Sequence, residues 1–97
     1  MQSTHPTVSK FPLGQIVATP AALELLDTHH ISPQSLLARH ESGDWGVLCS
    51  EDHESNEQAL KYGDRLFSSY PMGDNEKVWI ITEYDRSVTT ILLPADY

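Results

Sequence analysis

Residues 77–93 read Lys-Val-Trp-Ile-Ile-Thr-Glu-Tyr-Asp-Arg-Ser-Val-Thr-Thr-Ile-Leu-Leu, and this stretch decides the fold. Its β-rich runs, 77–84 and 88–93, are separated by the turn 85–87, and so short a connection predicts an antiparallel pair. The run 77–84 is apolar on both faces, which predicts a central strand. A looser run at 65–70 precedes the turn 73–76. The stretch therefore predicts a three-stranded antiparallel meander in the order 1-2-3, with 77–84 in the middle.

One face of this sheet must pack on helices, and the other is expected to stay partly open. We place Trp79 and Ile81 on the open face, opposite Phe67 and Ile91. Trp79 is then either a core side chain or an interface anchor, and the same two alternatives apply to Trp45 in its glycine-flanked turn. A homodimer formed through the open sheet face is one use for such a surface.

Two helix starts of the same kind lie upstream of the sheet. Thr19-Pro20 and Ser32-Pro33 each place a capping hydroxyl before a proline at the first helical position. Apolar spacing predicts one helix that ends near His30 and a second over about 33–41, joined as an αα-hairpin. Ser50 can cap a third helix over 51–62 that ends at Gly63. The apolar stripe of this helix is thin, which predicts a surface position.

The remaining segments are simpler. Residues 1–10 are polar and are expected to form a flexible N-terminal arm. The apolar segment 11–18 is broken by Pro12 and Gly14, so it reads as an extended lead-in or a short edge strand. We therefore expect one α+β domain over 11–97, with two or three short N-terminal helices packed on a C-terminal three-stranded antiparallel β-meander.

Composition limits the classes of function. The chain has 97 residues, no apolar run of transmembrane length and no export signal, and its single cysteine, Cys49, fits a reducing compartment. We therefore expect a cytoplasmic protein. Its net charge of −8 opposes direct binding to phosphate backbones. The stretch 41–57 carries six acids and no Lys or Arg, and it is the expected target of a positively charged partner.

Three stretches together carry a family resemblance: Phe11 to Pro20, Ser42-Gly-Asp-Trp-Gly46, and Ile81 to Pro94. In these stretches the chain resembles a family of small, mostly uncharacterised bacterial proteins labelled "plasmid-related", which are often carried on integrative elements. The likeness covers about Phe11 to Tyr97. It implies a mobile-element setting and no mechanism. Small acidic proteins in that setting include inhibitors of host defence nucleases and antitoxins.

Patterns of catalytic and metal-ligating residues are weak. His53 and Glu57 fall at i and i+4 near His40, but the chain has no His-Glu-x-x-His and no cysteine pair, so neither a metal nor a cofactor is expected. No nucleophile elbow or phosphate loop is present.

One enzymatic alternative rests on residues 82–90. Helices followed by an antiparallel sheet resemble the architecture of small ribonucleases of the barnase and RelE type. If this chain were such an enzyme, Glu83 would act as the base and Arg86 would stabilise the phosphorane. Thr89 and Thr90 would complete this site. The competing interpretation is a hairpin turn at 85–87 with Glu83 and Thr89 as a solvated pair. The shortage of basic residues favours the turn.

The expected function is a non-enzymatic, acidic protein-interaction module from a mobile element. Its partner would be a basic, nucleic-acid-handling protein, which it would inhibit or neutralise. The alternatives are the ribonuclease and a small dimeric domain of unrelated role. The candidate binding residues are Glu41, Asp44, Trp45, Glu51, Asp52, Glu54, Glu57 and Trp79.

Overall fold

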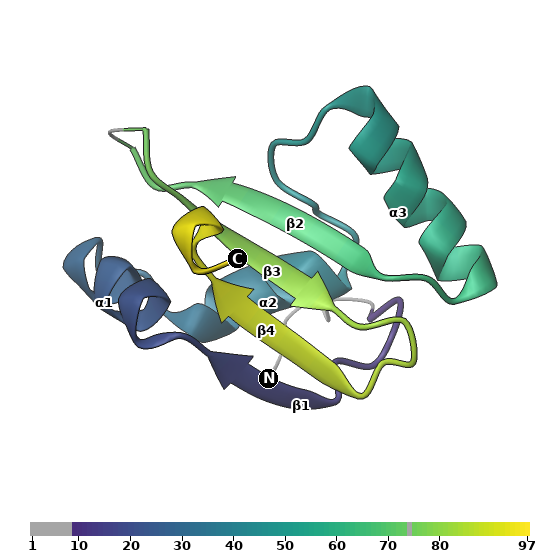
Figure 1. Ribbon diagram of the computed structural model, residues 1–97, viewed down its shortest axis with the longest axis horizontal. Helices are drawn as coiled ribbons and strands as arrows, with labels where there is room; N and C mark the ends of the chain where they lie inside the picture. The colour runs from purple at the N-terminus through teal and green to yellow at the C-terminus, as the bar shows by residue number, and fades with distance from the viewer. Residues whose placement is uncertain (1–8, 74) are drawn as a thin grey trace, which may run out of the picture.

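The computed structural model of the chain describes residues 9–73 and 75–97. Nearly all of the expected N-terminal arm, residues 1–8, therefore lies outside the described residues. The elements follow in the order β1 (Gln15–Ala18), α1 (Pro20–Thr28), α2 (Pro33–Glu41), α3 (Ser50–Tyr62), β2 (Leu66–Pro71), β3 (Lys77–Thr82), β4 (Val88–Leu92) and the 3-10 turn η1 (Pro94–Asp96) (Figure 1).

The strands form one four-stranded sheet in the order β1-β4-β3-β2. Strands β2, β3 and β4 make the expected antiparallel meander, with β3 between the other two. The prediction of a purely antiparallel, three-stranded sheet was wrong, because β1 joins the outer edge of β4 in parallel. The glycine at position 14 makes this possible: a Cβ there would lie 2.4 Å from the Arg86 carbonyl oxygen, and its φ is +67°. Only glycine lets the chain pass so close to the β3–β4 turn.

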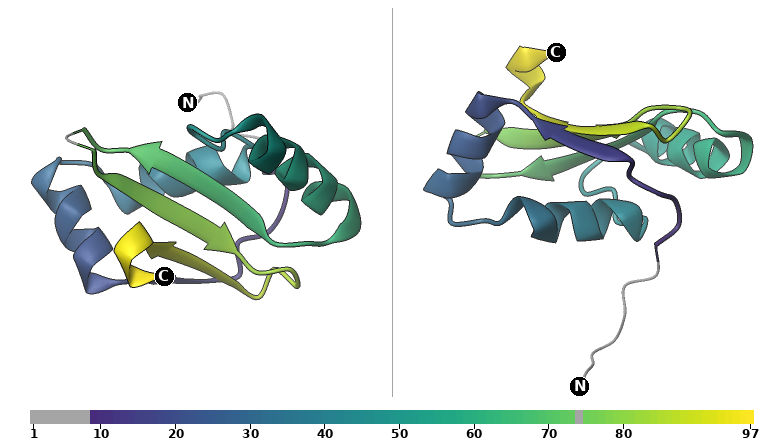
Figure 2. Two further views of the ribbon diagram at one scale, coloured as in Figure 1. Left: turned by 45° about the horizontal axis from the view of Figure 1, so that its top comes forward. Right: turned by 90° about the horizontal axis from the view of Figure 1, so that it is seen from below.

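Helices α1 and α2 cover one face of the sheet, and η1 lies on the other (Figure 2). The core between the helices and the sheet is built from Leu26 and Leu36 of the helices and from Tyr70, Ile80 and Ile91 of the strands. The prediction placed Ile91 beside Trp79, and this was wrong. Ile91 pairs with Ile80, so its side chain lies on the helix-covered face and is 1% exposed.

The predicted helix starts are confirmed for the first two helices. The Thr19 hydroxyl accepts from the Ala22 amide, and the Ser32 hydroxyl accepts from the Ser35 amide, at 3.2 Å each. The third helix begins one residue earlier than expected: Cys49 is its N-cap, without a side-chain bond. It ends as predicted at Gly63, whose φ is 79°.

Helix α3 does not share the face covered by α1 and α2, which corrects the expected helix placement. It runs beside the β2 edge of the sheet (Figure 1). The carboxamide of Asn56 binds the Phe67 backbone there twice: its nitrogen donates to the carbonyl at 2.6 Å, and its oxygen accepts from the amide at 3.0 Å. A side chain thus takes the place of a neighbouring strand.

The segment before α3 closes the rest of this edge. The Ser69 amide donates to the Trp45 carbonyl at 3.0 Å, and the Val47 amide donates to the Ser69 carbonyl at 2.8 Å. Gly46 is needed between them, because a Cβ there would lie 2.1 Å from the Ser69 carbonyl oxygen. Beneath this segment a second small core forms from Phe11, Trp45, Ala59 and Leu66. The β2 edge therefore presents paired backbone groups rather than free ones.

Candidate functional site

A group of exposed acidic side chains lies on the first two turns of α3. Only Asn56 and Ala59 of this helix are buried, and both face the sheet and the second core. The first two turns consequently project Glu51, Asp52 and Glu54 into solvent. Carboxylates near a helix N-terminus are favoured by the helix dipole, so these acids are compatible with the local fold.

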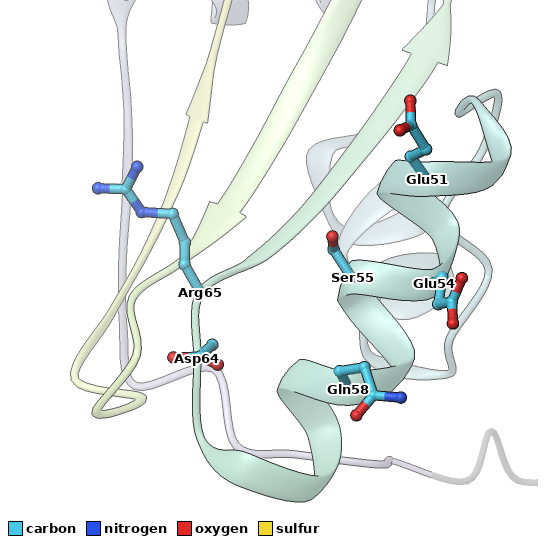
Figure 3. Close-up of a pocket in the computed structure, with 6 residues that line it drawn as sticks. All are labelled: Glu51, Glu54, Ser55, Gln58, Asp64 and Arg65. Carbon is cyan, nitrogen blue, oxygen red and sulfur yellow. The ribbon is translucent and has the colours of Figure 1, made fainter.

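An open groove of roughly 710 Å³ separates α3 from the beginning of β2 (Figure 3). Arg65, the basic residue of its lining, is directed away from α3 in Figure 3. Its guanidinium lies 3.3 Å from the Glu83 carboxylate and donates to the Tyr97 hydroxyl at 3.0 Å. The groove is therefore lined from α3 by acidic and polar side chains. Its lining residues are Glu51, Glu54, Ser55, Gln58, Asp64 and Arg65.

The other acids of the 41–57 stretch have structural partners. The Asp44 carboxylate pairs with Arg39 at 2.7 Å, and the hydrogen bond from this guanidinium holds the pKa of Asp44 below its ordinary value. The Glu41 carboxylate accepts from the Ser9 hydroxyl at 3.0 Å. That of Glu57 accepts from the Trp45 indole at 3.1 Å. Of the six predicted acids, Glu51, Asp52 and Glu54 are those for which the described residues show no such bond.

The two tryptophans have different roles. Trp45 is 2% exposed and packs in the second core, as the core alternative for this residue predicts, and its ring is not available at the surface. Trp79 is half-buried on the sheet face away from α1 and α2. Its ring meets Phe67 and Tyr97 edge to face, with centroids 5.1 and 5.9 Å away. This aromatic row covers part of the sheet and remains accessible at Tyr97, which is 73% exposed.

The proposed ribonuclease residues do not converge. Glu83 pairs with Arg65, as described above, whereas Arg86 turns inward to the end of α3. One guanidinium nitrogen of Arg86 donates to the Asp64 carbonyl at 2.6 Å, and the other donates to the Ala59 carbonyl at 2.9 Å. A cation that binds the last carbonyls of a helix also meets the negative end of its dipole. Arg86 fastens α3 to the β3–β4 turn.

The two threonines of that set lie on opposite faces of the sheet. Thr89 pairs with Thr82 and is fully buried on the helix-covered face. Thr90 pairs with Ile81 on the face that carries Trp79. No shared concave site therefore joins Thr89, Thr90, Glu83 and Arg86, as phosphoryl chemistry would require.

A buried polar chain, which the sequence interpretation missed, centres on His40. Its Nδ1 lies 2.6 Å from the Ser68 hydroxyl and its Nε2 2.9 Å from the Thr82 hydroxyl. Thr82 in turn lies 2.8 Å from the Thr89 hydroxyl, which donates to the Leu13 carbonyl at 2.6 Å. All four polar side chains are 0% exposed. The alternation of side chains along a strand could have predicted that Ser68, Thr82 and Thr89 point inward. It could not have predicted that they contact a helix residue.

The donor in each of these hydrogen bonds can be assigned by starting from the last acceptor, the Leu13 carbonyl. The Leu13 carbonyl can only accept, so Thr89 donates to it and must accept from Thr82. Thr82 has then used its proton, so His40 donates to it from Nε2. In the neutral imidazole Nδ1 is unprotonated and accepts from Ser68, so both ring nitrogens of neutral His40 are satisfied.

Burial first, and the nearby positive charge of Arg86 second, lower the pKa of His40 to about 3. The Ser68–His40 contact resembles a nucleophile and its base, but both groups are sealed from solvent. A substrate carbonyl cannot reach the Ser68 hydroxyl in this arrangement. The chain of hydrogen bonds holds α2 against the sheet instead.

Within residues 9–73 and 75–97, no three His, Cys, Asp or Glu side chains gather as metal ligands would. In the same part of the chain, every helix is too short or too polar to cross a membrane. The protein-family models, curated proteins and solved structures compared with this chain include none that matches it.

Proposed function

We propose that this protein is a non-enzymatic binding module whose acidic α3 surface docks onto a basic surface of another protein. The single observation that carries this proposal is the exposed acidic face of α3 beside the groove. The helix is fastened to the sheet by Asn56 and by Arg86, neither of which uses the carboxylates of Glu51, Asp52 and Glu54. These groups remain available to a ligand.

The chemistry of the surface indicates the chemistry of the partner. Adjacent carboxylates on a rigid helix attract lysine and arginine side chains, and the groove next to them offers further acceptors from Ser55, Gln58 and Asp64. Proteins that handle nucleic acids carry basic surfaces of this kind, since they must bind phosphates. The module would occupy that surface in place of nucleic acid. A role as an inhibitor or antitoxin on a mobile element, which the family resemblance suggests, fits this action.

The test is affinity capture from a nuclease-treated bacterial lysate, followed by mass spectrometry and by binding measurements on the purified partner. The variant Glu51→Lys/Asp52→Lys/Glu54→Lys should lose the partner while its circular dichroism stays unchanged. A matched variant, Glu24→Lys/Asp27→Lys/Glu76→Lys, makes the same change in net charge at exposed acids away from the groove. It should retain the partner.

Two further readouts define the mode of binding. Raising the salt concentration should weaken the complex, because exposed charges are screened over about 8 Å at physiological ionic strength. Added DNA or RNA should compete with this protein for the partner. Equal loss of binding in both triple variants would show that net charge, and not the α3 surface, is responsible. Undiminished binding by the folded α3 variant would refute the proposal.

A further inference from the structure

The two edges of the sheet differ in whether their outward backbone groups are paired. At the β2 edge, Asn56 and the 45–47 segment pair the outward amides and carbonyls of Phe67 and Ser69. At the other edge, β1 has β4 on one side only (Figure 1). Among the described residues, nothing binds the backbone on its outer side. In residues 9–73 and 75–97, one edge is closed by specific contacts and the other is open.

The hydrogen bonds to β4 show which groups of β1 are free. The amides of Gln15 and Thr19 donate to the Ser87 and Ile91 carbonyls, at 2.9 Å each. Backbone groups of alternate residues point to the same side of a strand, so the amides and carbonyls of Ile16 and Ala18 point away from β4. These groups can be satisfied by water or by one more extended strand.

The side chains at this edge favour a partner that is uncharged there. No Asp, Glu, Lys or Arg occurs between Phe11 and Leu23. Ile16 and Val17 are 47% and 39% exposed, which is unusual for apolar residues of an unprotected edge strand. The charged residues that commonly protect such an edge from pairing are absent from this stretch.

We propose that β1 pairs antiparallel with β1 of a second copy of this chain, which joins two sheets into one continuous eight-stranded sheet across a two-fold axis. Charge supports this occupant. The sheet order places β1 at the edge opposite β2 and α3 (Figure 1). Two copies of an acidic chain that meet at β1 therefore keep their α3 carboxylates at the far ends of the assembly. An isologous contact of this kind is the commonest way for two identical chains to meet.

One register uses all of the free backbone groups. Pairing Ile16 with Ala18 of the second copy, and Ala18 with its Ile16, makes both pairs hydrogen-bonded. The two-fold axis then passes beside Val17, which lies opposite Val17 of the second copy. This is a non-hydrogen-bonded pair, in which Cα atoms lie about 4.5 Å apart. The ladder cannot extend beyond this, because Gly14 would meet Pro20, which has no amide hydrogen.

This register predicts a specific cross-link. In a Cys49→Ser background, Val17→Cys should form an intermolecular disulfide on mild oxidation, since disulfides need Cα atoms about 4.4 to 6.8 Å apart. Gln15→Cys is the matched control on the same sheet face. The two copies of residue 15 would lie four strand positions apart, about 13 Å, and should not cross-link. Sedimentation equilibrium of the unmodified chain, up to millimolar concentration, should show twice the monomer mass of 10.9 kDa.

Two variants should abolish the dimer. Ile16→Pro removes an outward amide without touching the ladder to β4, a position at which edge strands tolerate proline. Val17→Lys places two like charges beside the axis. Trp79→Ala alters the open sheet face and should leave the dimer intact.

Three results would overturn the proposal: a monomer at every concentration, a disulfide from Gln15→Cys but not from Val17→Cys, or a dimer that Trp79→Ala removes and that both β1 variants retain. The proposal does not depend on the partner of α3, so the two can fail separately.

Discussion

At the scale of single residues, the buried histidine determines how the protein responds to acid. The pKa of His40 falls to about 3 in the folded chain, against an ordinary value of 6.5, so the unfolded chain binds the extra proton between these values. Stability is therefore fully present above about pH 6.5 and is lost as the pH falls toward 3. With about 1.4 kcal/mol for each pH unit, the loss approaches roughly 4 to 5 kcal/mol.

Urea unfolding at pH 7 and pH 4.5 measures this dependence. Asp44, Asp85 and Asp96, whose pKa values are lowered mainly by side-chain hydrogen bonds, act in the same direction but nearer to their ordinary range around 4. His40→Gln removes the titrating group. This substitution should lower the free energy of unfolding by roughly 1 to 3 kcal/mol at pH 7, because some of the hydroxyl groups that bind His40 are left unpaired. Its stability should change much less between the two pH values. An unchanged pH dependence in this variant would mean that His40 is not the group responsible.

At the scale of elements, α3 depends on one amide side chain for its position on the sheet. Asn56→Ala should destabilise the protein by roughly 2 to 3 kcal/mol, because it leaves the Phe67 amide and carbonyl unpaired at a partly buried edge. Asn56→Asp is the matched comparison: it keeps the acceptor for the Phe67 amide but sets a second oxygen against the Phe67 carbonyl at a position that is 2% exposed, so it should destabilise the protein at least as much as Asn56→Ala. Chemical denaturation measures both effects. Hydrogen exchange at Phe67 should rise sharply in Asn56→Ala, and slow exchange there would contradict this role.

The elements also show what the sequence could and could not specify. Local signals were sufficient for the helices, because Thr19-Pro20, Ser32-Pro33 and Gly63 act on their own neighbours. The parallel β1–β4 pair was not predictable in the same way. It joins Gln15 to Val88, and its requirement for Gly14 appears only when the β3–β4 turn is in place. The same limit applies to the candidate site. Charge pattern alone located the acids, but it could not show that Asp44 and Glu57 already bind Arg39 and Trp45, or that Trp45 itself is buried.

At the scale of the whole molecule, the charge of −8 makes the folded state sensitive to salt. Bringing fourteen acids together with six bases produces net repulsion, and salt screens it. The melting temperature should therefore rise between about 10 and 150 mM NaCl, where the screening length falls from about 30 to 8 Å. Two exposed ion pairs, Arg39–Asp44 and Arg65–Glu83, oppose this trend weakly. Differential scanning calorimetry checks the prediction. A melting temperature that falls with salt would show that these pairs outweigh the repulsion.

The position of β4 between β1 and β3 has a consequence for synthesis on the ribosome. β1 leaves the ribosome long before β4, yet β4 is the strand that β1 contacts. Until residues 88–91 leave the exit tunnel, Ile16 and Val17 have no strand on either side, and the meander cannot be joined to the N-terminal segment. Contacts of such long sequence separation form slowly, because the intervening chain must be ordered first. A nascent chain that stalls before Val88 therefore exposes an apolar, uncharged strand, the kind of segment that molecular chaperones exist to shield.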